Sequence, residues 1–195
     1  MKARLLSTST RLLQFFGLLV LAHLTMAATA LAQMAPAPGG PVIISIAGGI
    51  THHNRGASDP KRDGFFAYHE IQFSKAFGFD LEMLDAMPQH EITCQPPQYA
   101  KNATFRGPRL VDVLKKAGAQ NVSIKTRALD GFAVDLTSQE IMAKDWILAT
   151  RADGKPFGIG GKGPVWLMHT PSVQKVPEAE EQGWPWAVFY IETKK

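Results

Sequence analysis

The chain has 195 residues, of which 45% are hydrophobic and 19% charged, a composition typical of a globular protein. It carries 21 lysines and arginines against 17 acidic residues. Without Lys2, Arg4 and Arg11, which lie in a segment expected to be removed, 18 basic residues nearly balance the 17 acidic ones. A basic stripe with interleaved aromatic residues is also missing, so we expect no nucleic-acid binding.

Residues 1–32 have the pattern of a cleavable signal peptide. The three basic residues precede or open the apolar stretch 12–28, and Ala30 and Ala32 put small side chains where a signal peptidase cleaves. An uncleaved membrane anchor is the alternative, but the stretch is short and a segment rich in proline and glycine follows it. We therefore expect export, with no membrane span after cleavage.

Cleavage would make Gln33 the first residue of the mature protein. Residues 33–41 are rich in proline and glycine and predict a flexible leader, and residues 42–195 have the size of a single domain. We expect this domain in the periplasm or another extracytoplasmic space. The sequence indicates no particular protein partner.

Most of the predicted elements are short strands. Apolar or alternating stretches bounded by glycine or proline predict strands at 42–46, 68–73, 91–94, 122–128, 132–136, 146–150, 165–169 and 187–192. A loop is expected over 51–64, and the pair Asp130-Gly131 favours a hairpin turn.

Helices are fewer. Residues 80–87 predict one or two helical turns that end at Pro88, and the apolar spacing over 109–117 predicts a helix that ends at Gly118. Thr137 and a glutamate three residues later have the spacing of a capping box. The helices do not alternate regularly with the strands, so we predict an α+β fold with mixed or mainly antiparallel sheets.

Cys94 is the one cysteine, which excludes an intramolecular disulfide. It ends a predicted strand and precedes a loop stiffened by Pro96 and Pro97, a position from which a side chain can face a pocket. A thiolate there would suit a soft or high-valent metal. A buried thiol that packs as a small hydrophobic group is the other interpretation.

Several cations could hold a small anion. Lys101, Arg106 and Arg109 flank the loop after Cys94, and Lys162 lies in a glycine-rich run that ends at Gly163. Ordinary surface charge and a plain turn are the alternatives.

Trp166, Trp184 and Trp186 could line a pocket, but aromatic residues in late strands are more often core. His52 and His53 predict a solvated loop pair rather than a metal site, because adjacent side chains on an extended chain point apart.

Five segments in a fixed order carry a family resemblance: FDLEMLDAMPQHEIT from Phe79, TFRGPRLVDVLKKAGA from Thr104, ALDGFAVDL from Ala128, ILATRADGKPF from Ile147 and KGPVWLM from Lys162. They resemble the oxidoreductase molybdopterin-binding domain, with its sulfite-oxidase-like fold, in a small stand-alone exported form. The match spans about residues 79–191.

The resemblance implies a molybdenum-dependent oxidoreductase acting on a small, anionic substrate. Cys94 would bind the metal of a molybdenum-molybdopterin cofactor through its sulfur, and the cofactor would carry the chemistry. No catalytic residue is assigned. The implied cofactor contacts are Thr93, Arg106, Arg109, Lys162 and Gly163.

A second hypothesis comes from the segments that differ from the family. Where the family has a stretch similar to His-Gly-x-Pro-x-Arg and a later lysine-rich segment, this chain has Lys162–Trp166 and Gly183–Trp186. Tryptophan cannot neutralise a phosphate. The alternative is a cofactor-free binding or sensory module on the same scaffold, which binds a small ligand or a partner.

Overall fold

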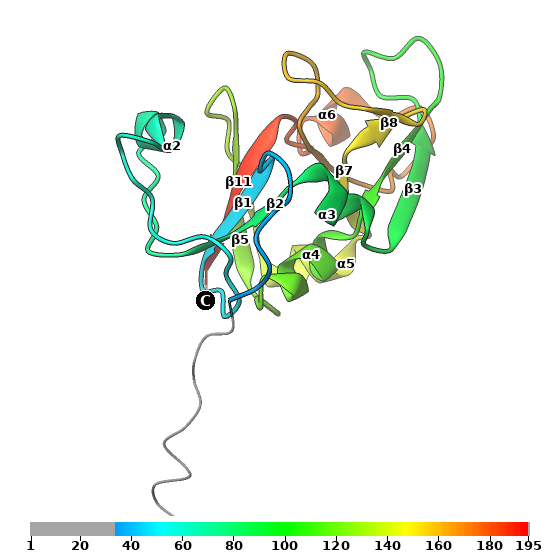
Figure 1. Cartoon of the computed structure of the whole chain (residues 1–195). Coiled ribbons are helices and arrows are strands. Elements are labelled where there is room, and N and C mark those ends of the chain that lie inside the picture. Colours follow the sequence, from blue (N-terminus) through cyan, green and yellow to red (C-terminus); the bar gives the residue numbers. More distant parts are fainter. Residues whose placement is uncertain (1–33, 195) are drawn as a thin grey trace, which may run out of the picture. The chain divides into compact units, whose positions relative to one another are not determined.

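The structure, a computed structural model, describes residues 34–194 (Figure 1), so the expected signal peptide lies outside the described residues. The strands are β1 (Ile44–Gly48), β2 (Ala76–Phe79), β3 (Gln89–Cys94), β4 (Ala103–Pro108), β5 (Ser123–Ala128), β6 (Asp135–Leu136), β7 (Trp146–Ala149), β8 (Arg151–Ala152), β9 (Lys155–Pro156), β10 (Trp166–His169) and β11 (Val188–Lys194). The helices are α2 (Gly64–Tyr68), α3 (Leu81–Asp85), α4 (Leu110–Lys116), α5 (Ser138–Ala143) and α6 (Glu178–Glu181).

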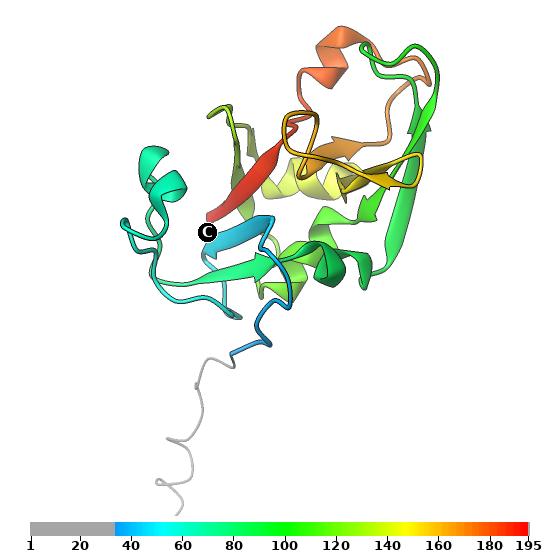
Figure 2. The same ribbon diagram turned by 45° about the horizontal axis from the view of Figure 1, so that its top comes forward.

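Three sheets organise these strands. A five-stranded sheet has the order β2-β1-β11-β5-β6, a four-stranded sheet has the order β3-β4-β8-β9, and β10 pairs with β7. Figures 1 and 2 show β1 and β11 on one side of the domain and β3 and β4 on the other. Among the strands of residues 34–194, β1 with β11 is the one parallel pair. The predicted α+β class with mainly antiparallel sheets is confirmed.

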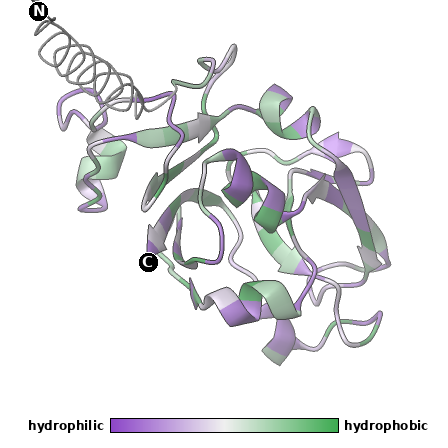
Figure 3. Cartoon of the chain, turned by 90° about the horizontal axis from the view of Figure 1, so that it is seen from below, coloured by the Kyte–Doolittle hydropathy of each residue, from purple (hydrophilic) through white to green (hydrophobic). Residues whose placement is uncertain are grey.

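Helix α4 forms where the apolar spacing of the sequence predicts it. Leu110, Val113 and Leu114 are buried in the core, whereas Lys115 and Lys116 in the last turn are exposed. Figure 3 shows hydrophobic and hydrophilic residues alternating along the helices, as expected of elements that cover a core with one face. The capping box before α5 is also confirmed, because the Thr137 and Glu140 side chains each accept the other's backbone N–H.

One N-terminal expectation differs from the structure. Residues 68–73 form no strand: Tyr68 ends α2 and residues 69–73 follow it as a loop, and the edge strand of the sheet is β2. Residues of the expected leader form hydrogen bonds with the domain. The backbone N–H of Ala35 donates to the His53 carbonyl at 2.9 Å, and that of Gly40 donates to Asp80 Oδ2 at 2.7 Å.

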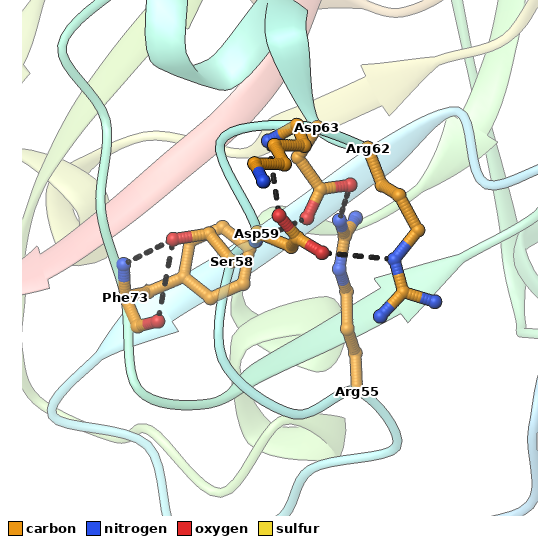
Figure 4. Close-up of polar contacts among 7 residues, drawn as sticks. Arg55, Ser58, Asp59, Arg62, Asp63 and Phe73 are labelled. Atoms are coloured by element: carbon orange, nitrogen blue, oxygen red, sulfur yellow. Dashed lines mark hydrogen bonds and ion pairs between the residues drawn. The ribbon is translucent and has the colours of Figure 1, made fainter.

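The long connection between β1 and β2 is held by its own side chains (Figure 4). Arg55 pairs with Asp63, and its guanidinium carbon lies 5.0 and 5.2 Å from the ring centres of Phe66 and Phe73. The backbone N–H of Phe73 donates to Ser58 Oγ at 3.2 Å. These contacts hold the connection between β1 and β2 in a defined conformation, although the sequence predicts only a loop over residues 51–64.

Within residues 34–194, no helix is both long and apolar enough to cross a membrane.

Candidate functional site

Cys94 is the last residue of β3, which pairs antiparallel with β4 and places Cys94 opposite Ala103. Side chains alternate along a strand, so Ile92 and Cys94 point to the same face. That face is the core: Cys94 is 0% exposed and belongs to the main apolar cluster with Ile92, Ala103 and Phe105. The side chain is therefore packed among hydrocarbon groups.

Burial raises the pKa of the Cys94 thiol to about 11, and the charge of Glu180 adds to the effect. In the absence of a metal the sulfur is thus a protonated thiol at neutral pH. Burial and the negative charge of Glu180 both favour this protonated form.

Thr93 and Arg106 face the other side of the same sheet. Both side chains are exposed; Thr93 Oγ1 lies 2.9 Å from Thr104 Oγ1, and Arg106 is opposite Glu91 in the strand register. The alternation of β3 and β4 separates these two residues from Cys94 by the thickness of the sheet.

Arg109 lies at the far end of the strand pair. It occupies the N-cap position of α4, its Nε donates to His90 Nδ1 at 3.4 Å, and its guanidinium lies 3.5 Å from Asp145. His90 precedes Cys94 by four residues on β3, a separation of about 13 Å in an extended strand. Arg109 is thus held away from the sulfur by its own partners.

Lys162 and Gly163 form part of a different site. Lys162 Nζ lies 3.0 Å from Glu181 Oε1, with side-chain exposures of 18% and 9%, so the pair is largely desolvated. Gly163 is buried because the chain passes close to itself: a Cβ there would lie 2.7 Å from the Gly158 carbonyl oxygen. Its role is close packing rather than anion contact.

The residues that the resemblance implies for the molybdenum cofactor are therefore not brought together. The sulfur is in the core, Thr93 and Arg106 are across a sheet, and the charge of Lys162 is already neutralised. These residues do not fit the cofactor. In the described part of the chain, no three His, Cys, Asp or Glu side chains gather closely enough to hold a metal ion either.

A cleft forms instead beside Lys162. Its cavity volume is about 550 Å³, and it is lined by Asp130, Phe132, Glu181, Gln182, Trp184 and Trp186. The turn between β5 and β6 supplies the first two residues, and α6 with the segment after it supplies the rest. The sequence suggested the tryptophans as pocket residues and the turn at Asp130-Gly131, but nothing in it connected the two segments.

The tryptophans of this region have different environments. Trp166 and Trp184 are core residues, as favoured from the sequence, whereas Trp186 is 39% exposed and the core prediction is wrong for it. Trp166 Nε1 donates to the Trp184 carbonyl at 3.1 Å. Trp184 Nε1 is buried and has no acceptor within the described residues. The atom is covered by protein, so a ligand in the cleft does not reach it.

Comparisons with known proteins do not assign the chain to a family. No family model and no curated protein matches the chain. Among solved structures it is similar to the sulfane dehydrogenase SoxCD from Paracoccus pantotrophus, with 15% identity and a TM-score of 0.49. The alignment covers 77% of this chain and 37% of that chain, so this chain spans little more than a third of its length. The fold class above therefore depends on the chain's own strands and helices.

Proposed function

We propose that this chain is an exported small-molecule-binding module on a sulfite-oxidase-like scaffold, and that it works without a molybdenum cofactor. The observation that carries the proposal is the position of Cys94, fully buried in the apolar core, with Thr93 and Arg106 on the exposed face of the same strands. A sulfur in that position packs as a small hydrophobic group and is not presented to a cofactor cleft.

The aromatic cleft supports the binding half of the proposal. Ligand sites are typically concave and mostly apolar, with a few polar groups that fix orientation. This cleft combines three aromatic rings with Asp130, Glu181 and Gln182. Export remains part of the proposal and is supported by the N-terminal pattern of basic and apolar residues.

The test begins with metal content. The full chain and its Cys94→Ala variant are produced in a bacterial host that makes the molybdenum cofactor, and both are assayed for molybdenum and pterin per chain. We expect the same substoichiometric molybdenum in both proteins. One molybdenum per chain in the wild type, lost in the variant, would restore the oxidoreductase assignment.

Binding is tested separately by a thermal-shift screen of small molecules against the wild type and Trp186→Ala. A ligand that binds only the folded protein raises its melting temperature. We expect a compound that stabilises the wild type and not the variant. Stabilisation that is equal in both proteins for every hit would place the binding outside the cleft.

A further inference from the structure

The cleft beside Lys162 has a lining that restricts the chemistry of its ligand, and this inference rests on the proposed binding function. Two of its aromatic side chains are presented to solvent: Phe132 is 48% exposed and Trp186 is 39% exposed. Exposed aromatic faces beside polar groups suit a ligand that has an apolar face and a polar edge.

Binding of an organic cation is disfavoured because Lys162 already places a positive charge against the tryptophan rings. Lys162 Nζ lies 4.6 Å from the ring centre of Trp166 and 5.1 Å from that of Trp186. It thus occupies the cation–π position of these rings. A second positive charge against Trp186 would be repelled by this ammonium group.

An anion is disfavoured by the same charge arrangement. Asp130 and Glu181 both line the cleft, and the one ammonium group near them is paired with Glu181 at 3.0 Å. A negatively charged ligand would meet two carboxylates.

The polar groups that remain are suited to hydroxyls. The side-chain amide of Gln182 can both donate and accept. Asp130 Oδ1 accepts the backbone N–H of Phe132 at 2.9 Å, which leaves its second oxygen as an acceptor. A hydroxyl group is both a donor and an acceptor, so one type of group satisfies both.

We propose that the cleft binds a neutral carbohydrate, reversibly and without chemical change. The C–H face of a sugar ring packs on Trp186 and Phe132. Its hydroxyls donate to Asp130 and form hydrogen bonds with the side-chain amide of Gln182. A volume of about 550 Å³ accommodates a saccharide of one or two rings.

The test is calorimetric titration and tryptophan fluorescence of the full chain with glucose, galactose, N-acetylglucosamine and maltose at millimolar concentration, followed by a neutral oligosaccharide array. Choline and inorganic phosphate are the charged probes. We expect at least one neutral sugar to bind and to change the fluorescence. Trp186→Ala and Phe132→Ala should each weaken binding about tenfold, equivalent to 1.4 kcal/mol.

Gln182→Ala removes a side-chain amide that lines the cleft, so it should weaken binding by about three- to tenfold. Met142→Ala, which truncates a 67% exposed side chain on α5 outside the cleft, is the matched control and should bind as the wild type does. Far-ultraviolet circular dichroism and the melting temperature identify any variant that fails to fold, and Asp130→Asn then replaces it.

Binding of choline or phosphate with no binding of any sugar would overturn the carbohydrate assignment and leave a binding module. Sugar binding that no cleft variant weakens would also overturn it. Molybdenum at one atom per chain, held by Cys94, would instead overturn the function on which it rests.

Discussion

Cys94 and the cleft beside Lys162 are the two regions of this protein from which chemistry was expected, and they differ in what surrounds the polar atom. The Cys94 sulfur is enclosed by apolar side chains that exclude solvent, and the charge that acts on it, that of Glu180, is negative. The cleft is open and contains an ion pair and exposed aromatic rings. Cys94 therefore occupies the sequence position of the family's metal ligand without the surroundings that such a ligand needs.

The largest loss of stability is expected on β4, which pairs with β3, the strand that ends at Cys94. Gly107 on β4 passes so close to β7 that an added Cβ would lie 1.9 Å from the Leu148 carbonyl oxygen. We expect Gly107→Ala to destabilise the protein by about 3 kcal/mol or more, measured by urea unfolding. Gly56→Ala is the control, because a Cβ there meets nothing within 4 Å. Equal stability of the two variants would show that this region is not closely packed.

In the cleft, Lys162→Met leaves the carboxylate of Glu181 buried without its partner. We expect a loss of about 2–3 kcal/mol in the free energy of unfolding. The double variant Lys162→Met/Glu181→Gln should recover most of that loss, since it removes the unpaired charge. No recovery in the double variant would mean that the ion pair is not the source of the effect.

The core position of Cys94 predicts a difference between two small substitutions. Cys94→Ser places a hydroxyl without a partner in apolar surroundings and should cost about 1–2 kcal/mol more than Cys94→Ala. Urea unfolding of both variants measures this difference. A serine variant as stable as the alanine variant would indicate that the side chain has a polar neighbour or reaches solvent.

The pH dependence of stability is the effect confined to alkaline conditions. The pKa of Cys94 rises from 9.0 to about 11 on folding, so the folded state keeps the proton over a range in which the unfolded state loses it. The stabilisation is complete below pH 9 and falls as pH rises toward 11, by about 1.4 kcal/mol for each unit. The stability of the wild type minus that of Cys94→Ala should show this decline, and a flat difference would contradict the burial.

Sequence patterns correctly predicted the elements that depend on interactions between residues close together in the chain. The apolar spacing of α4, the capping box of α5 and the turn at Asp130-Gly131 all formed as expected. Strand β4 was missed because its sequence, ATFRGP, contains glycine and proline, which weaken a strand pattern. Gly107 is nevertheless required there because β7 lies against it.

The cleft could not be predicted in the same way. Phe132 and Glu181 are separated by 49 positions in the sequence, and they line one cavity because β5, β6 and α6 meet in the folded domain. Trp186 differs from Trp184 only in exposure, which depends on tertiary packing rather than on residue type. The orientation of Cys94 followed from its register with β4, which the sequence pattern did not reveal.

The reactivity of the Cys94 thiol, in protein made by a host that lacks the molybdenum cofactor, distinguishes a core sulfur from a cofactor ligand. A sulfur in the core should react with a thiol reagent only as fast as the protein unfolds, and fully once urea is added. A sulfur positioned in an open cofactor cleft would react at once, with one equivalent per chain, in the native protein. Immediate reaction would show that Cys94 is not buried in the core.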